Sequence, residues 1–288
     1  MSKPQATVIG FGAILLWALL ALLTVGSEPT PPLLLNAICF SIGGSLGLLW
    51  CAANGTLAEL RAVPLKVYAF GSVALFAYHA LYFSALRLAP AAEAGLIAYL
   101  WPLLIVLFSG LLPGEQLRAG HIIGAALGFC GAGLIVSGGG AGFQMTYLPG
   151  YGLALLCALT WSSYSVISRR FADIPTSSVT VFCLVSALAS WLLHGMVEET
   201  IWPQTTLAWL SALGLGLGPV GLAFFVWDIG VKRGDIQMLG TVSYATPLLS
   251  TVVLIVAGFA QFSWGLAAAA ALITLAALCA AFASRQAK

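Results

Sequence analysis

The sequence has very few charged residues. Only 7% of the 288 residues are Asp, Glu, Lys or Arg, whereas 61% are hydrophobic. A soluble domain usually has about a quarter of its residues charged, so this chain could not cover a water-facing surface. The composition therefore excludes an ordinary soluble protein and indicates that lipid surrounds most of the surface. The net charge of +2 is too small to indicate a nucleic-acid partner.

The sequence also lacks the cysteine and histidine spacings of metal sites. The six cysteines fall inside or at the edge of apolar runs, without a CxxC or a His-paired spacing. We therefore expect small buried side chains, with no disulfide, metal or cofactor. The apolar run that follows Lys3 is longer than that of a signal peptide, and further runs follow it. An uncleaved first helix is the better interpretation.

Apolar runs long enough to cross a membrane occur throughout the chain. A spanning helix needs about 20 such residues. Breaks at polar residues, proline and glycine leave ten runs, which predict an all-α polytopic membrane protein with ten transmembrane helices. The expected spans are 6–25, 32–52, 67–87, 90–112, 118–137, 150–169, 177–197, 207–231, 236–258 and 263–284.

Lysine and arginine are distributed unevenly over the predicted loops. Positively charged residues stay on the cytoplasmic side of a membrane. With the N-terminus in the cytoplasm, only Arg87 of the 11 such residues lies on the opposite side. The pattern predicts cytoplasmic N- and C-termini. The cytoplasmic residues are Lys3, Arg61, Lys66, Arg118, Arg169, Arg170, Lys232, Arg233, Arg285 and Lys288.

A short motif occurs twice, half a chain apart. Tyr-Leu-Trp-Pro-Leu-Leu at 99–104 resembles Tyr-Ala-Thr-Pro-Leu-Leu at 244–249, an offset of 145 residues. Each half holds five spans, an odd number, so the second copy enters the membrane from the opposite side. The sequence thus predicts two inverted five-helix repeats, 1–145 and 146–288. Further matches at offsets of 145 or 144 are Gly95 with Gly240, Arg87 with Lys232, and Trp17 with Trp161.

Pro102 and Pro247 lie in the middle of their spans. Each removes a backbone hydrogen bond and clashes with the carbonyl four residues earlier, which predicts kinks near Ala98 and Ser243. A kink that serves only helix packing is the alternative, since proline is common in such helices. One proline in each half favours a pair of bends that flank a central cavity and take part in gating.

Several aromatic residues lie too deep to belong to the membrane interfaces. A buried Tyr hydroxyl or Trp N–H needs a partner that lipid tails cannot supply, so these groups should face the bundle interior. Aromatic core packing remains an alternative for each of them. For His79, deep in its span, a neutral ring satisfied by a neighbour is an equal alternative. The candidate substrate-binding residues are Trp17, Tyr78, His79, Tyr82, Tyr99, Trp101, Trp161, Tyr164, Ser243 and Tyr244.

No Asp, Glu, Lys or Arg is placed at the centre of the bilayer. A relay of protons through deep carboxylates has no residues to use, and a strongly anionic substrate would lack a cationic partner. An intramembrane enzyme would need a deep catalytic pair or a metal, and a sensor would normally carry a soluble domain. A transporter therefore remains the preferred interpretation, ahead of an enzyme or a sensor.

The ten spans, the paired Trp17 and Trp161 and the repeated Tyr-x-x-Pro resemble the drug/metabolite transporter superfamily. Within it, the sequence resembles the EamA-type proteins, and most of all the YddG group of aromatic amino-acid exporters. The resemblance implies a basket of helices around a central cavity, with the fifth and tenth spans peripheral. It also implies export of amino acids, preferably aromatic, and of related metabolites across a bacterial inner membrane. We expect a monomer in the bilayer that works by facilitated diffusion or exchange.

Overall fold

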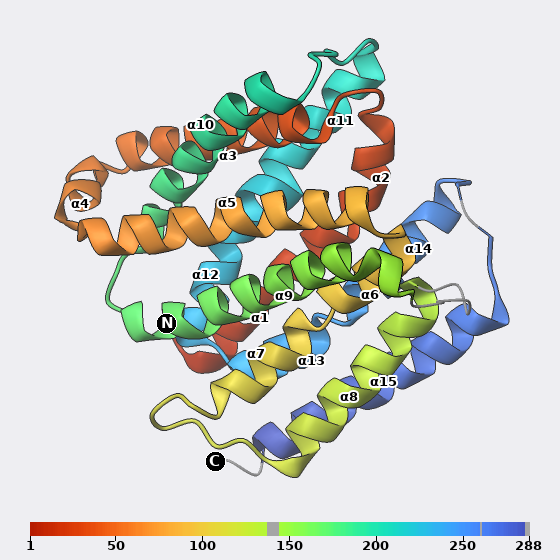
Figure 1. Ribbon diagram of the computed structural model, residues 1–288. Helices are drawn as coiled ribbons and strands as arrows, with labels where there is room; N and C mark the ends of the chain where they lie inside the picture. Colours follow the sequence, from red (N-terminus) through yellow and green to blue (C-terminus); the bar gives the residue numbers. More distant parts are fainter. Residues whose placement is uncertain (137–143, 260, 286–288) are drawn as a thin grey trace.

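The computed structural model describes residues 1–136, 144–259 and 261–285, and all regular structure in those residues is helical (Figure 1). Among them, nine helical segments are long and apolar enough to cross a membrane, and the shorter Glu93–Ser109 supplies a tenth. The predicted ten-helix membrane fold is therefore confirmed. The predicted end of the fifth span at 137, and Lys288, lie outside the described residues.

Two spans in the first half consist of two helices each. The first span is α1 with α2, and the fourth is α6 with α7. The helices are α1 (Lys3–Ala18), α2 (Leu20–Gly26), α3 (Pro32–Ala53), the short connecting α4 (Leu57–Ala62), α5 (Leu65–Leu88), α6 (Ala91–Ala98), α7 (Trp101–Ser109) and α8 (Ala119–Val136).

Two spans in the second half are also interrupted. The eighth span consists of α11, a π-helical turn and α12, and the ninth of α13 with α14. The elements are α9 (Leu148–Ser168), α10 (Val179–Val197), α11 (Thr206–Leu217), the π-helical turn Gly218–Leu222, α12 (Ala223–Arg233), α13 (Ile236–Val242), α14 (Ala245–Val256) and α15 (Trp264–Arg285).

The repeated motif breaks its two spans within one residue of equivalent places. Residues 99–100 separate α6 from α7, and residues 243–244 separate α13 from α14. Pro102 and Pro247 lie in the first turn of the following helix, where the missing N–H would have had no partner within the helix. The breaks lie where the prolines predict kinks, whereas a gating role for the prolines stays a prediction.

Two other interruptions were not predicted from the sequence. The first span changes direction at Leu19, whose N–H donates to the Leu16 carbonyl in the tighter i to i−3 pattern. The eighth span widens into the π-helical turn that contains Pro219. In this turn Gly221 lies so close to the Gly216 carbonyl that a side chain would collide with it. Neither change disturbs the apolar pattern, which explains why a search for apolar runs misses them.

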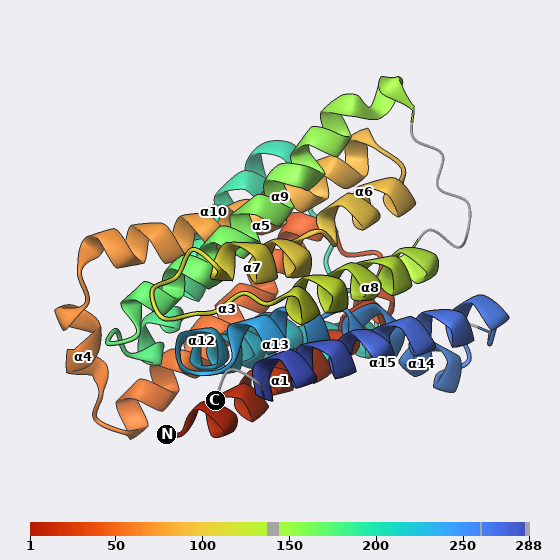
Figure 2. The same ribbon diagram turned by 90° about the horizontal axis from the view of Figure 1, so that it is seen from below.

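Helices of the first half pair with helices of the second half, and the pattern of pairs stays the same when each helix is replaced by its equivalent in the other half. α3 pairs with α10 and α8 with α15, while the pairs α1–α12 and α5–α9 exchange with each other. An inverted repeat requires this pairing, because each span must meet the equivalents of its own neighbours. Figures 1 and 2 show α8 and α15 side by side at one edge of the bundle, away from α3 and α10.

Backbones touch where the first and eighth spans cross. A Cβ atom added to Gly10 would lie 2.8 Å from the Cα atom of Gly230, so only glycine fits there. The equivalent residues in the other pair of spans are Ala154 and Ala85, which are fully buried in one apolar cluster. Small residues thus hold both crossings close, and the glycine crossing is the closer.

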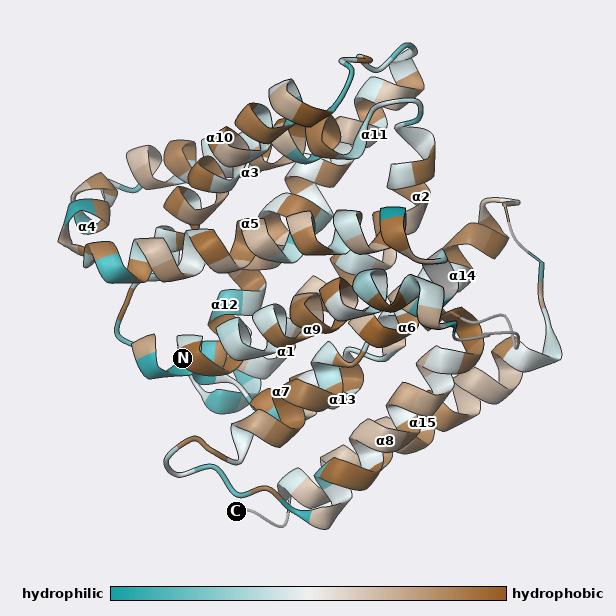
Figure 3. Cartoon of the chain, viewed as in Figure 1, coloured by the Kyte–Doolittle hydropathy of each residue, from teal (hydrophilic) through white to brown (hydrophobic). Residues whose placement is uncertain are grey.

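The outer surface is apolar along most of its length. Hydrophilic residues gather near the helix ends and in the connections (Figure 3). Val8, Leu111 and Trp264 are 72%, 75% and 85% exposed, which would be costly in water and is ordinary in contact with lipid.

Candidate functional site

Four indole rings meet in the middle of the bundle. Trp17, Trp101, Trp161 and Trp227 come from α1, α7, α9 and α12, and the centroids of every pair lie 5.1–6.5 Å apart. Such pairs each contribute about 0.5–1.5 kcal/mol beyond the burial of their area. We call these residues the indole cluster. It joins spans from both halves at the centre of the molecule.

Two of the four indole N–H groups of this cluster donate to groups on other helices. Trp17 Nε1 donates to the Pro219 carbonyl over 3.1 Å, in the π-helical turn. Trp227 Nε1 donates to Ser165 Oγ, also over 3.1 Å. A π-helical turn changes the regular hydrogen-bond pattern of a helix, and here its carbonyl fixes the orientation of Trp17.

Partly exposed polar rings lie beside the indole cluster. Tyr78 stacks on Tyr82 at 6.4 Å and contacts Trp161 at 5.3 Å. Tyr99 lies near enough to Tyr78 and Tyr82 for their hydroxyl groups to interact electrostatically. These contacts with α9 and with the α6–α7 break direct the tyrosines into the bundle rather than toward lipid.

His79 lies among aromatic rings from two other helices. Its ring centroid is 5.0 Å from that of Phe40 on α3 and 6.1 Å from that of Phe224 on α12. His79 Nδ1 is 2.8 Å from the Leu75 carbonyl oxygen. A carbonyl can only accept, so Nδ1 carries the hydrogen, and in a neutral ring Nε2 is then an acceptor. We call Tyr78, His79, Tyr82 and Tyr99 the polar ring group.

Three predicted site residues lie outside these two groups. Tyr164 is buried behind Trp161, with its ring stacked on Phe70 at 5.7 Å. Ser243 is buried and donates to the Leu239 carbonyl within its own span. Tyr244 is fully buried and lies between the fourth, fifth and ninth spans. The structure therefore brings together Trp17, Tyr78, His79, Tyr82, Tyr99, Trp101 and Trp161, adds Tyr164 behind Trp161 at 5.3 Å, and leaves Ser243 and Tyr244 apart.

Trp227 and Phe224 were missing from the residues predicted from the sequence. At the offset of 145 residues, Trp227 is equivalent to Tyr82 and Phe224 to His79. The repeat that relates the two Tyr-x-x-Pro motifs therefore also predicts a ring-bearing face on the eighth span. Applying the offset to every candidate in the third span would have found both residues.

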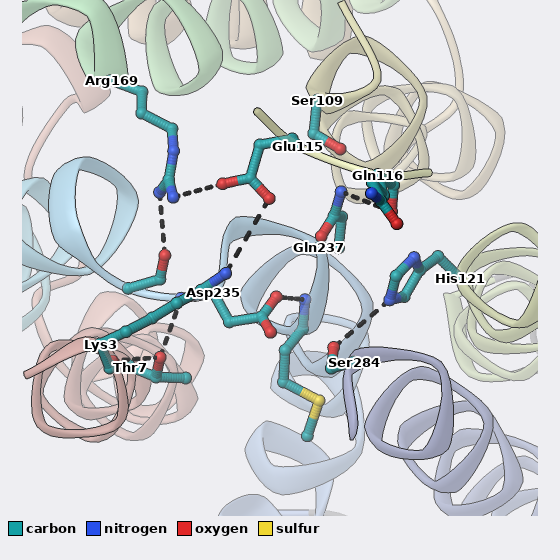
Figure 4. Close-up of polar contacts among 12 residues, drawn as sticks. Lys3, Thr7, Ser109, Glu115, Gln116, His121, Arg169, Asp235, Gln237 and Ser284 are labelled. Carbon is teal, nitrogen blue, oxygen red and sulfur yellow. Dashed lines mark hydrogen bonds and ion pairs between the residues drawn. The ribbon is translucent and has the colours of Figure 1, made fainter. Parts of the chain in front are cut away.

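Charged and polar groups tie several spans together at one end of the bundle, which we call the N-terminal face (Figure 4). The Arg169 guanidinium pairs with Glu115 and donates to the carbonyls of Val231 and Gly234 over 2.9 and 2.8 Å. Lys3 Nζ lies 4.0 Å from Glu115. These contacts link the first, sixth and eighth spans to the α7–α8 connection. The N-terminal face is therefore closed.

At the other end, which we call the opposite face, one carboxylate collects several donors. Glu198 accepts from the N–H groups of Leu33 and Leu34 and from Arg87 over 3.1–3.2 Å, and His194 Nδ1 is 2.9 Å away. These bonds tie the second, third and seventh spans together.

The N-terminal face has an equivalent anchor. Lys232 pairs with Asp228 at 2.9 Å and donates to the Ile174 carbonyl, and Thr176 donates to Asp228. Lys232 is equivalent to Arg87. Each cation links the end of its own span to the start of the span before it, Lys232 directly through the Ile174 carbonyl and Arg87 through Glu198. These two anchors are alike, so they do not distinguish the two faces.

The faces differ in how the broken spans pack. α13 packs on α7, and a Cβ atom on Gly240 would lie 3.0–3.2 Å from Val106, Ile105 and the Pro102 carbonyl. The equivalent pair is α6 and α14, which do not pack along each other in the described residues. Near Gly95, which is equivalent to Gly240, the close atom belongs to α8. The N-terminal face is therefore closed by packing of α13 on α7, whereas α6 and α14 do not pack in the same way at the opposite face.

The chemistry that this arrangement offers is that of hydrogen bonds and ring stacking. Among the described residues, no three His, Cys, Asp or Glu side chains come close enough to hold a metal ion. The polar ring group offers hydroxyl groups and one imidazole, which can form hydrogen bonds and stack on a flat molecule.

Ten spans in an inverted repeat, with rings at the centre and half-spans that pack on each other at one face only, are the architecture of a secondary transporter. The chain belongs to the EamA-like transporter family, whose model matches residues 5–137 and 148–282. The family and its fold are thereby shown, and the resemblance inferred from the sequence is confirmed.

Individual relatives agree with this assignment. The chain is 53% identical to an aromatic amino acid exporter YddG of Ancylobacter novellus, over 95% of this chain and 96% of the relative. It is 29% identical to a protein of the same name from Salmonella typhimurium, over 87% of this chain and 88% of the relative. A solved crystal structure superposes with a TM-score of 0.95 at 52% identity and covers 99% of both chains.

Proposed function

We propose that this protein exports amino acids, preferably aromatic and other apolar ones, and related metabolites across a bacterial inner membrane. The observation that carries the proposal is the partly exposed polar ring group beside the indole cluster. Rings from several helices can stack on a flat side chain, while hydroxyl groups and imidazole bind the polar end of an amino acid. The names of the relatives support this substrate class.

We further propose the orientation and the division of the chain. The N-terminal face carries Lys3, Arg118, Arg169 and Lys232, so it is the cytoplasmic face, and the opposite face is periplasmic. The repeats divide between residues 145 and 146. The protein acts as a monomer, and the structure corresponds to an outward-open state of alternating access.

The proposed transport is facilitated diffusion or exchange without a coupled ion. His79 is the titratable side chain of the polar ring group, and its Nδ1 is bonded to the Leu75 carbonyl of its own helix. We assign His79 to substrate contact or gating rather than to stoichiometric proton transfer. Transport involves no covalent chemistry, and we assign no enzymatic activity to the chain.

Counterflow into proteoliposomes tests the substrate. A panel of labelled amino acids should show uptake of Phe, Trp and Tyr above that of small or charged ones. Trp101→Ala and Trp161→Ala should weaken uptake while the protein still inserts. Trp264→Ala is the control, because this residue is 85% exposed on the outer surface of the bundle and is not part of the indole cluster. Normal transport by both cluster variants would overturn the site.

Imposed gradients test the energy coupling. We expect equilibration of substrate without any ion gradient, and no accumulation when a pH or sodium gradient is added. Accumulation above equilibrium that disappears in His79→Ala would show a coupled transporter and contradict the proposal.

Labelling of introduced cysteines tests the orientation. In a background without the native cysteines, Gln204→Cys on the opposite face should react with an impermeant thiol reagent added to intact cells. Asp173→Cys, in the connection after α9, should react only after the cells are opened. The reverse pattern would reject the orientation.

A further inference from the structure

The phenol of Tyr244 caps a helix of the other repeat. Its hydroxyl oxygen accepts the N–H of Leu103 over 3.0 Å, across 141 positions of sequence. The first turn of a helix has N–H groups without acceptors inside the helix, and α7 begins at Trp101. The Leu103 N–H is one of these groups. Tyr244 thus satisfies a donor that the break before α7 leaves without an acceptor.

The position of Tyr244 is tightly defined. The side chain is fully buried and its ring contacts Phe129 at 6.3 Å between centroids. The ring lies flat against Gly128, where an added Cβ atom would be 2.9 Å from Tyr244 Cγ. This position on α8 must be small for the phenol to reach Leu103. The cap is therefore part of the packing that holds α13 on α7.

The equivalent tyrosine is in a different environment. Tyr99 is partly exposed and lies near Tyr82 and Tyr78. The residue equivalent to Leu103 is Leu248, which follows Pro247 in the first turn of α14. Leu248 is the fourth residue of α14, whereas Leu103 is the third residue of α7, so the Leu248 N–H becomes the equivalent donor only if the first turn of α14 unwinds by one residue. α14 and α6 do not pack along each other in the described residues.

We propose that Tyr244 and Tyr99 are alternating caps, each of which holds one face closed by accepting the N–H of the leucine after the other repeat's proline. In the observed state Tyr244 caps Leu103 and the N-terminal face is closed. In the reverse state Tyr99 caps Leu248, α6 packs on α14, and Tyr244 releases Leu103. Both tyrosines are positioning residues that act on the helix breaks. The inference rests on the proposed alternating access.

The two caps are not equally favourable. The residue equivalent to Gly128 is Ile273 on α15, which is itself buried. If the Tyr99 ring reaches Leu248 from the equivalent direction, it meets the branched side chain of Ile273, whereas the Tyr244 ring meets only Gly128. The Tyr244-capped state is therefore favoured at rest, in agreement with the face that the structure shows closed.

Two matched substitutions test the exchange. Spin labels at Leu111 and Arg233 report the N-terminal face, and labels at Leu88 and Val256 report the opposite face. Tyr244→Phe should shift the ratio of the two states about fivefold toward the state with the N-terminal face open, since one hydrogen bond is lost. Tyr99→Phe should shift the ratio by a similar factor in the other direction.

The controls separate this effect from general loosening. Tyr68→Phe removes a phenol that donates to the Leu60 carbonyl, away from both breaks, and should leave the ratio unchanged. The double variant Tyr99→Phe/Tyr244→Phe should return to near the wild-type ratio. Equal shifts in one direction, or unchanged distances in both single variants, would overturn the caps.

The spin-label distances test the caps, and the transport assay tests the proposed function, so either can be contradicted alone. If the wild type exchanges amino acids while the distances ignore both substitutions, the caps are wrong and the proposed function stands. If the distances shift as expected and no amino acid is exchanged, the caps stand and the proposed substrate is wrong.

Discussion

One motif occupies two environments in this molecule. At the N-terminal face the break after Val242 is buried, with α13 packed on α7 and Tyr244 bonded to Leu103. At the opposite face the equivalent break leaves Tyr99 partly exposed and α6 apart from α14. The backbone is broken within one residue of the same place in both. The difference therefore lies in how the half-spans pack, which a small tilt can change without refolding.

The two faces also differ in charge. Glu115 and Arg169 pair across the N-terminal face, whereas the residue equivalent to Arg169 is the uncharged Val25. The opposite face cannot be closed by the same ion pair. Closure there depends on apolar packing and on hydrogen bonds, which makes the two states unequal in energy.

The largest expected effect concerns the centre shared by both states. Trp227→Ala removes a fully buried indole with three indole neighbours and should lower the free energy of unfolding by about 3–5 kcal/mol. The equivalent Tyr82→Ala should cost less, because Tyr82 is partly exposed. Thermal unfolding in detergent measures both. Equal losses would show that the two spans contribute alike.

A second pair of substitutions blocks each closure in turn. Gly240→Val puts a branched side chain against Val106 and Ile105 and should disfavour the closed N-terminal face by about 1–3 kcal/mol. Gly95→Val should leave the observed state nearly intact and obstruct packing of α6 on α14. Both should slow counterflow, with spin-label distances shifted in opposite directions. A shift in the same direction would break the comparison.

Removal of one charge should have a smaller effect. Glu115→Gln leaves Arg169 with its two carbonyl partners and should favour opening of the N-terminal face by about 1–2 kcal/mol, since the pair is partly buried. Glu198→Gln should reduce thermal stability without changing the ratio of states, because that anchor joins spans that stay together. The same spin-label pairs distinguish the two outcomes.

The smallest effect is expected at Thr7. Its hydroxyl accepts the Asp235 N–H over 2.8 Å, at the start of α13. Thr7→Val keeps the shape and removes the acceptor, which should weaken the docking of α13 by about 0.5–1.5 kcal/mol. Faster thiol labelling of a cysteine introduced at Met238 would register the change, and Thr274→Val on the outer side of α15 is the control.

The sequence contains enough information for the spans, the two breaks at the Tyr-x-x-Pro motifs and most of the central rings. Apolar length, matched prolines and deep aromatics depend on local composition, so the sequence alone identifies Trp101 and Trp161. Tyr244 could not be separated from Tyr99 in this way, because the two share one motif. Which of them is buried depends on which face is closed, and no local pattern records that state.

Other features depend on contacts between distant loops. Glu115 and Arg169 lie 54 positions apart and show no periodic signal that joins them. The turn at Leu19 has no proline or glycine beside it, so it follows from packing rather than from local preference. Trp227, in contrast, is predictable, since the offset of the repeat relates it to Tyr82.

The glycine crossing is the point about which a tilt of the first span against the eighth would turn. Gly10 and Gly230 bring the two backbones into contact, and Trp17 lies seven residues further along the same helix. At about 1.5 Å per residue, the lever arm from the pivot to the indole is roughly 10 Å. A rotation of about 10° there would carry Trp17 through nearly 2 Å of arc, about half the distance between stacked rings. A small tilt about this single contact would thus rearrange the whole indole cluster.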